Sequence, residues 1–172
     1  EMRDFETVDI AIKSALTGHL ILSTLHTNDA PSAIVRLMNM GIEAFLIAST
    51  LTLIAAQRLC RKICQKCKES YELSVADLSG LPQDFKDTVA TFYRGKGCGY
   101  CNGTGYFGRV AVVEALIIDD QARQMILKNT PLTEIREYAR KQGMKTLRED
   151  AIEKCLAAEV SLEEALRVTP EG

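Results

Sequence analysis

Two Cys-x-x-Cys pairs constrain the fold of this chain more than any other feature. Cys64 and Cys67 form the first pair, Cys98 and Cys101 form the second, and 30 residues separate the pairs. Two residues between cysteines allow a tight turn that aims both thiols at one point, and two such turns make a tetrahedral site. The sequence therefore predicts a structural zinc site, with a connecting loop that folds back on itself.

Other readings of the cysteines remain open. A redox dithiol needs only one pair, at a strand-to-helix turn. Iron also accepts four thiolates, so the spacing alone does not identify the metal. The two remaining cysteines, Cys60 and Cys155, have Leu or Ile neighbours on expected helix stripes, and we interpret them as small buried hydrophobic residues.

A basic run surrounds the first cysteine pair. Five Lys or Arg residues and no acidic residue occur between Arg58 and Lys68. Positive charge beside a thiolate cluster lowers thiol pKa values and favours metal binding. The simpler interpretation is a solvated helix face.

The composition excludes several classes of protein. The 172 residues are 47% hydrophobic and carry a net charge of −2, which indicates a globular chain without a general attraction to nucleic acid or anionic membranes. No signal peptide is visible, and the apolar stretch over 42–56 is too short to cross a bilayer and predicts a buried helix. We expect a cytosolic chain and, because it begins abruptly without Met, a portion of a longer protein.

Helical and extended segments alternate in the first part of the chain, which is typical of the α/β class. The apolar spacing predicts a helix over 5–16 and a strand buried on both faces over 19–26. Two helices follow, one ending at Gly41 and a longer one over about 43–61. A single strand cannot form a sheet, so we expect its partners upstream or elsewhere.

The second part of the chain predicts a strand over 107–118 followed by helices. Asp119 and Thr146 are expected to cap two of these helices, and Ser161 with Glu164 predicts a capping box for the last. We expect these short amphipathic helices to pack on each other as a small C-terminal bundle.

The two histidines, His19 and His26, lie seven residues apart. Within one strand this odd spacing places them on opposite faces, with His26 at the carboxyl end beside a helix start, where an anion such as phosphate can bind. A surface or hydrogen-bonded core histidine is the alternative. Glu1 and Arg3 carry no signal of their own.

Several sequence strings together closely resemble the C-terminal part of the secretion ATPases of the GspE/PilB kind, which serve type II secretion and type IV pilus assembly. They are EMRDFETVDIAIKSALTGHLILSTLHTNDAPSAIVRL, QRLCRKICQKC, CGYCNGTGYFGRVAVVEAL and GMKTLREDAIEKCL. The resemblance implies a partial RecA-like P-loop NTPase core in a homo-hexameric ring, in the cytoplasm and peripheral to the inner membrane. It also implies an inner-membrane platform protein as a partner, and no nucleic acid.

The resemblance assigns roles residue by residue. Glu1 matches the Walker B glutamate, which organises Mg2+ and the attacking water, and Arg3 is a weaker candidate for nucleotide or interface contact. His26 would sense the γ-phosphate of ATP, and His19 would support the histidine box. The four paired cysteines match the family's metal-binding motif.

The chain departs from the family pattern because it has no G-x-x-x-x-G-K-[ST] loop. We therefore expect that it neither binds ATP tightly nor hydrolyses it alone. The expected domains are the ATPase core over 1–61, the zinc insert over 62–108, and a strand with the helical subdomain over 109–172. A free-standing zinc-knuckle module that binds protein or nucleic acid is the alternative function, because the string over 98–105 resembles the cysteine repeat of DnaJ-type chaperones.

Overall fold

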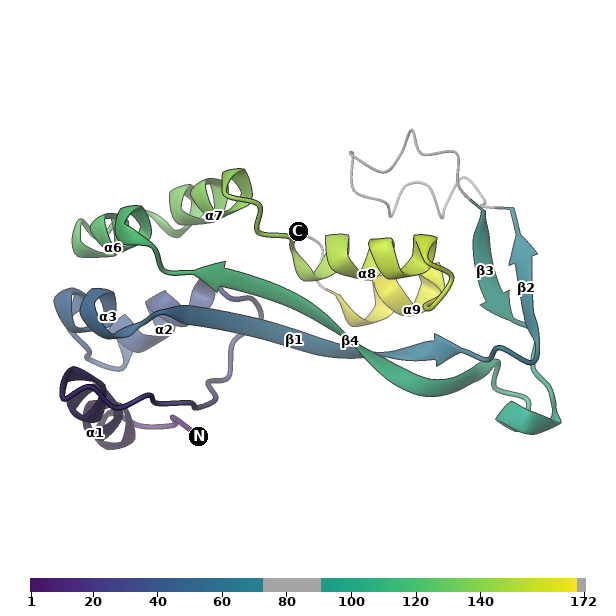
Figure 1. The fold of residues 1–172 in the computed structure, drawn as a ribbon, viewed down its shortest axis with the longest axis horizontal. Helices are drawn as coiled ribbons and strands as arrows, with labels where there is room; N and C mark the ends of the chain where they lie inside the picture. The colour runs from purple at the N-terminus through teal and green to yellow at the C-terminus, as the bar shows by residue number, and fades with distance from the viewer. Residues whose placement is uncertain (73–90, 170–172) are drawn as a thin grey trace. The chain divides into compact units, whose positions relative to one another are not determined.

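The fold consists of two compact units joined by two long strands. The computed structural model describes residues 1–72 and 91–169. The first unit comprises Glu1–Ala56 and Glu114–Met144, and the second comprises Gln57–Val113 and Lys145–Gly172. The division differs from the expected three segments because strands β1 (Leu53–Ile63) and β4 (Tyr106–Ile117) each contribute residues to both units. These strands pair and run in opposite directions (Figure 1).

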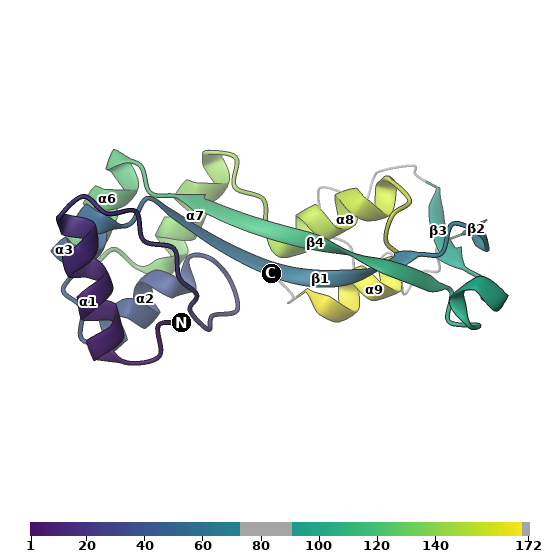
Figure 2. The same cartoon turned by 60° about the horizontal axis from the view of Figure 1, so that its bottom comes forward.

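The first unit is helical apart from the strand ends. Helix α3 contacts α1, α2 and α6, and α6 packs on α7 (Figure 2). Its apolar core draws on every one of these helices and on β4. The helices are α1 (Phe5–Leu16), α2 (Ser32–Asn39), α3 (Ala44–Thr50), α6 (Asp120–Leu127) and α7 (Leu132–Lys141).

The first two helices confirm the expected segments. Asp4 caps α1 by accepting a hydrogen bond from the Thr7 N–H, and Gly18, with φ of 92°, follows its end. Asp29 accepts from the Ser32 N–H at 2.8 Å and so satisfies the first turn of α2.

The expected helix over 43–61 is wrong. Helix α3 ends at Thr50, Leu51 turns to an extended conformation with ψ of 136°, and β1 follows. Short apolar runs do not distinguish a helix from a strand by periodicity. Here β4 decides the outcome by supplying a partner strand: Ile118 donates to the Thr52 carbonyl (3.0 Å), and Cys64 donates to the Gly105 carbonyl (2.9 Å).

The expected strand over 19–26 is also not formed within the described residues. No helix or strand is assigned there, and Leu20 and Leu22 are 81% and 86% exposed rather than buried on both faces. A strand needs a neighbouring ladder, whereas here the Met2 N–H bonds to the Thr24 carbonyl (2.9 Å) and the His19 N–H bonds back to the Ser14 carbonyl of α1 (3.2 Å).

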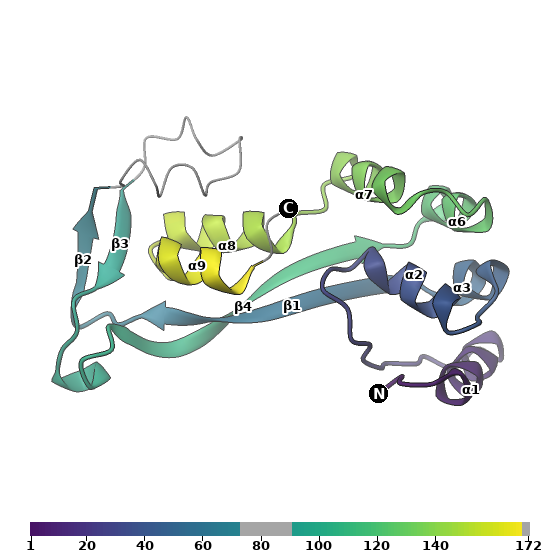
Figure 3. The same ribbon diagram turned by 180° about the vertical axis from the view of Figure 1, so that it is seen from behind.

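Besides its parts of β1 and β4, the described portion of the second unit contains two short strands, two α-helices and a one-turn 3-10 helix. Strands β2 (Lys68–Tyr71) and β3 (Phe92–Gly95) form an antiparallel ladder, and β3 contacts both α8 (Leu147–Leu156) and α9 (Leu162–Val168), which pack on each other (Figure 3). Since α6 and α7 belong to the first unit, the four C-terminal helices do not form the single bundle that we expected.

Helix capping follows the sequence at three positions and departs from it at one. Asp119 accepts from the Ala122 N–H, and Thr146 forms a reciprocal capping box with Glu149. Ser161 accepts from the Glu164 N–H, but the Glu164 side chain accepts from Arg61. This carboxylate therefore joins α9 to β1 instead of completing a box.

Candidate functional site

Each cysteine pair lies in a tight turn. Cys64 follows β1 directly, and the Cys67 N–H donates to the Cys64 carbonyl at 3.2 Å. Cys98 and Cys101 bracket the one-turn 3-10 helix η1 (Gly99–Cys101), where the Gly103 N–H donates to the Cys98 carbonyl at 2.9 Å. Both turns therefore have the compact geometry that the spacing predicts.

The β2–β3 ladder brings the two turns together. Strand β2 begins directly after Cys67, and its register pairs Lys68 with Gly95, so that β3 ends just before the second turn. The Lys96 N–H continues the pairing with a bond to the Cys67 carbonyl (3.0 Å). The chain between the cysteine pairs thus folds back, as expected; residues 73–90 lie outside the described part.

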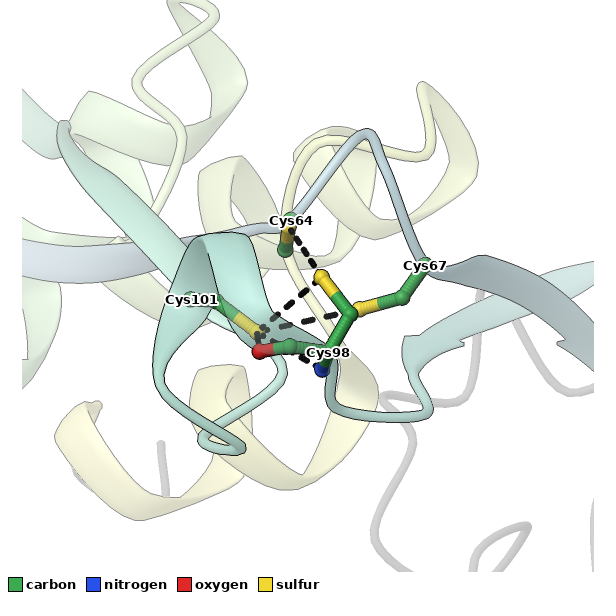
Figure 4. A group of neighbouring side chains, drawn as sticks. All are labelled: Cys64, Cys67, Cys98 and Cys101. Carbon is green, nitrogen blue, oxygen red and sulfur yellow. Dashed lines mark hydrogen bonds between the residues drawn. The ribbon is translucent and has the colours of Figure 1, made fainter.

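The four thiols converge on one point (Figure 4). All four Sγ atoms lie within 4.8 Å of one another. The Cys98–Cys101, Cys67–Cys101 and Cys64–Cys98 sulfurs are 3.8, 3.9 and 4.0 Å apart. Sulfurs that bind a tetrahedral ion at about 2.3 Å lie about 3.8 Å from each other, whereas disulfide sulfurs lie about 2 Å apart. The group is therefore four free thiols that could hold a metal ion.

Backbone N–H groups point at two of the sulfurs. Cys101 Sγ accepts from the N–H groups of Cys98 (3.3 Å) and Gly105 (3.2 Å), and Cys67 Sγ accepts from Gly97 (3.3 Å). Burial disfavours a thiolate at Cys101, but these two donors and the neighbouring thiols outweigh it and lower the pKa of Cys101. Because metal ligands must be thiolates, the lowered pKa favours metal binding at Cys101, whereas burial raises the pKa of Cys67 to about 12.

Two glycines make the close packing of this site possible. The small residues over 102–105 were expected to let N–H groups approach the sulfurs, as Gly105 does, but the contact of Gly105 with Gly95 was not predicted. A Cβ on Gly95 would lie 1.9 Å from the Gly105 carbonyl oxygen, and a Cβ on Gly105 would lie 2.4 Å from the Gly95 oxygen. Gly105 also has φ of 76°, which side chains rarely adopt. The two backbones therefore touch, which lets Gly105 bond to both cysteine pairs.

A buried carboxylate anchors the strand that leads into the site. Glu164, fully buried on α9, accepts from the Arg61 backbone (2.9 Å) and side chain (2.6 Å), and from Arg167 (2.8 Å). Although burial favours the neutral acid, the two guanidinium groups lower the pKa of Glu164 to about 2. Arg61, three residues before Cys64, also stacks 4.1 Å above the Tyr106 ring.

The basic run is therefore not a solvated helix face, because Arg58 to Ile63 belong to β1. Two of its charges are matched by acids from distant segments: Arg61 by Glu164, and Lys62 by Glu159 at 3.3 Å. Lys68 lies 5.0 Å above the Tyr93 ring. Three of the five basic residues of the run therefore make specific contacts next to the first cysteine pair.

The two remaining cysteines are buried. Cys60 lies on β1 rather than on a helix, and Cys155 lies on α8. Burial raises the pKa of Cys60 to about 11 and that of Cys155 to about 12. Neither thiol belongs to the group of four.

The structure brings three of the expected nucleotide-site residues together. Glu1 forms an ion pair with Arg3 (2.7 Å), and its carboxylate lies 2.6 Å from His26 Nε2, across 25 residues of chain. The Arg3 guanidinium, more than His26, holds the pKa of the Glu1 carboxyl below its usual range. His26 is 86% exposed, so the cluster lies open at the surface of the first unit.

His19 lies apart from this cluster. Its Nδ1 contacts the Thr17 hydroxyl (3.1 Å) and the Ser14 carbonyl (3.2 Å), at the end of α1. Together with the His19 N–H, which also bonds to Ser14, these contacts fix the chain as it leaves the helix.

The chain belongs to the type II/IV secretion system protein family, whose model matches residues 1–167. It is 46% identical over 172 residues to the type IV pilus assembly ATPase PilB of Thermus thermophilus, covering 99% of this chain and 19% of that protein. It is 43% identical over 171 residues to the type II secretion system protein E of Pseudomonas aeruginosa, covering 99% of this chain and 34% of the relative. The chain thus spans about a fifth to a third of these relatives.

Solved structures share the fold. The pilus retraction motor PilT with bound ADP superposes with a TM-score of 0.65 at 24% identity, over 99% of this chain and 38% of that one. The Legionella pneumophila ATPase DotB gives a TM-score of 0.59 at 23% identity, over 96% of this chain and 36% of that one. Among the described residues, none of the helices is both long and apolar enough to traverse a bilayer.

Proposed function

We propose that this chain is the carboxy-terminal part of a motor ATPase that powers type II secretion or type IV pilus assembly. Family membership over 1–167 supports the proposal. The identity to a pilus assembly ATPase and to a type II secretion protein is similar, so the proposal includes both machines. The motor would be a homo-hexameric RecA-like ring on the cytoplasmic face of the inner membrane, acting on a platform protein there.

The approach of Glu1 to His26 carries the nucleotide part of the proposal. Two residues far apart in sequence, each expected at the nucleotide, lie 2.6 Å apart beside Arg3. When bound, ATP with Mg2+ supplies the phosphoryl group that is transferred to water. Ionised Glu1 would orient that water and the cation, His26 would donate to the γ-phosphate, and Arg3 would keep Glu1 ionised or contact a neighbouring subunit. His19 would hold the backbone that leads to His26.

A fusion that places the amino-terminal part of the Thermus thermophilus relative before residue 1 tests these roles, because this chain has no P-loop of its own. We expect Glu1→Gln to lower ATP hydrolysis about 100-fold or more, as for loss of a residue that orients the nucleophile. Glu6→Gln, an exposed acid on α1, is the control and should retain activity. Equal rates for Glu1→Gln and the parent would contradict the proposal. Sub-micromolar ATP affinity of the isolated chain in calorimetry would contradict the separate expectation that this chain alone does not bind ATP tightly.

We propose that the four cysteines hold one structural Zn2+. The sulfur spacing fits a closed tetrahedral site with no position left for a substrate. Zinc supplies a cross-link between the two turns, and the N–H groups of Gly97 and Gly105 disperse the charge of the thiolates.

The cysteine lobe, defined as residues 64–72 and 91–105, is the proposed contact for the platform protein. Tyr100 in the lobe and Phe107 just after it are each 54% exposed, with ring centroids 4.5 Å apart, and exposed aromatic side chains favour protein interfaces. Tyr100→Ser with Phe107→Ser should retain ATPase activity in the fusion and lose secretion or piliation; unchanged export would contradict this contact. Salt-dependent DNA or RNA binding by the lobe would instead favour the zinc-knuckle alternative.

A further inference from the structure

Glu114 is a buried carboxylate within an otherwise apolar stretch of β4. It is 4% exposed and lies between Val112 and Leu116, which are 0% and 2% exposed. A charged group at such a position is costly unless hydrogen bonds satisfy it, and an aliphatic side chain would bury more apolar surface. Packing alone therefore does not account for Glu114.

The carboxylate reaches the loop that follows His26. Glu114 Oε1 accepts a hydrogen bond of 2.8 Å from the backbone N–H of Ala30, across 84 residues of sequence. Ala30 is itself fully buried, so its N–H depends on a protein partner. Both residues belong to the first unit.

The neighbouring residue of the loop is held as well. Asp29 Oδ1 accepts from the Ser32 N–H (2.8 Å), and its Oδ2 pairs with Arg136 of α7 (3.2 Å). Arg136 is 41% exposed, whereas the bond from the Ala30 N–H to Glu114 is buried, so we expect Glu114 to be the stronger tether. The four residues that separate His26 from Pro31 thus have two fixed points.

We propose that Glu114 is a positioning residue. It holds the His26 loop, residues 27–30, against β4 and so sets where the His26 imidazole faces Glu1. The inference rests on the proposed nucleotide role of His26. Because the His26 side chain is exposed, its position depends on the backbone on either side of it. The Met2 N–H bonds to the Thr24 carbonyl before it (2.9 Å), and Glu114 accepts from Ala30 after it. Glu114 supplies the second of these restraints without touching nucleotide.

Two substitutions of similar volume separate the hydrogen bond from packing. Glu114→Gln keeps a side-chain oxygen that can accept from Ala30, whereas Glu114→Met fills the same space without one. Leu116→Ala, which removes a buried side chain from the same strand, is the control for a general loss of stability.

NMR on the chain itself gives the direct readout. We expect Glu114→Met to raise hydrogen exchange at the Ala30 amide about tenfold relative to the Ile47 amide, and to shift the His26 ring signals. Glu114→Gln should stay near the parent, and Leu116→Ala should raise exchange at both amides alike. Unchanged Ala30 exchange in Glu114→Met, or a Gln variant as disturbed as Met, would overturn the proposal.

ATP hydrolysis by the fusion described above gives the functional readout. We expect Glu114→Met to lower kcat about tenfold with little change in KM, and Glu114→Gln to restore most of it. An equal kcat loss in Leu116→Ala would overturn the positioning role. If His26→Ala hydrolyses ATP like the parent, the proposed role of His26 fails, while the NMR result still decides whether Glu114 positions the loop.

Discussion

The cysteine lobe and the Glu1–His26 cluster differ in how much of each site this chain provides. The lobe contributes all four sulfurs, the backbone donors around them and the ladder that aligns the turns. The Glu1–His26 cluster has an 86% exposed imidazole, and the segment before it exposes Leu20 and Leu22. A site whose parts all lie in one chain can form by itself, whereas an open cluster depends on neighbouring segments for its final geometry.

Metal removal should have the largest effect, and that effect should be confined to the second unit, which contains the cysteine lobe. Chelation or Cys67→Ser should abolish the cooperative melting of the second unit and leave the first unit folded, because structural metal binding is coupled to folding. Hydrogen exchange by unit, together with metal content per chain, checks this. Cys155→Ala, a buried thiol outside the group, should retain one metal per chain. A metal-free chain with an equally protected lobe would contradict the site.

Gly105→Ala should destabilise the second unit by about 3 kcal/mol, from backbone strain at positive φ and overpacking against Gly95. Denaturant unfolding of the metal-loaded chain measures it. The matched control is Gly99→Ala, since a Cβ there meets nothing within 4 Å. Similar losses of stability in the two variants would show that the close contact with Gly95 is not the reason for glycine at position 105.

Glu164→Gln should cost about 2 kcal/mol at pH 7, less than breaking a fully buried ion pair, because Arg61 and Arg167 are half-exposed and keep part of their hydration. The pKa of Glu164 is about 2, below its ordinary 4.5, so its stabilisation is present above pH 4.5 and is lost as the pH falls toward 2. Urea unfolding across this range should show a steeper decline for the parent than for the variant. Glu163→Gln, the exposed neighbour on α9, should behave like the parent.

His26→Ala should have the smallest effect on the isolated chain. Its contact with Glu1 is exposed, so the melting temperature should change by no more than about 1 °C. Val8→Ala, a 1% exposed core position of the same unit, should lower it clearly. A large loss in His26→Ala would mean that the chain completes this site by itself, which would remove the contrast with the cysteine lobe.

Features formed by residues close together in the sequence were predicted correctly, whereas features that depend on residues far apart were missed. The cysteine turns and the Asp119, Thr146 and Ser161 caps involve residues a few positions apart, and all of them formed. The strand β1 was missed because its partner β4 lies about 50 residues further on, and an apolar run alone does not choose between helix and strand.

The roles of the two buried acids were hidden for the same reason. Glu164 pairs with a residue 103 positions away, so local spacing suggested only a capping box. Glu114 was missed although a signal was present: a lone acid within the apolar string VAVVEALII. Such a residue is buried at a cost, which points to a specific partner.

The contact between Gly95 and Gly105 has a consequence for finding this lobe in genomes. Two positions without side chains, ten residues apart and straddling the second cysteine pair, form a fingerprint independent of the thiols. A sequence that keeps the cysteines but has lost both glycines should route its backbone differently around the four thiols, and the two features together should select true equivalents more sharply than either one.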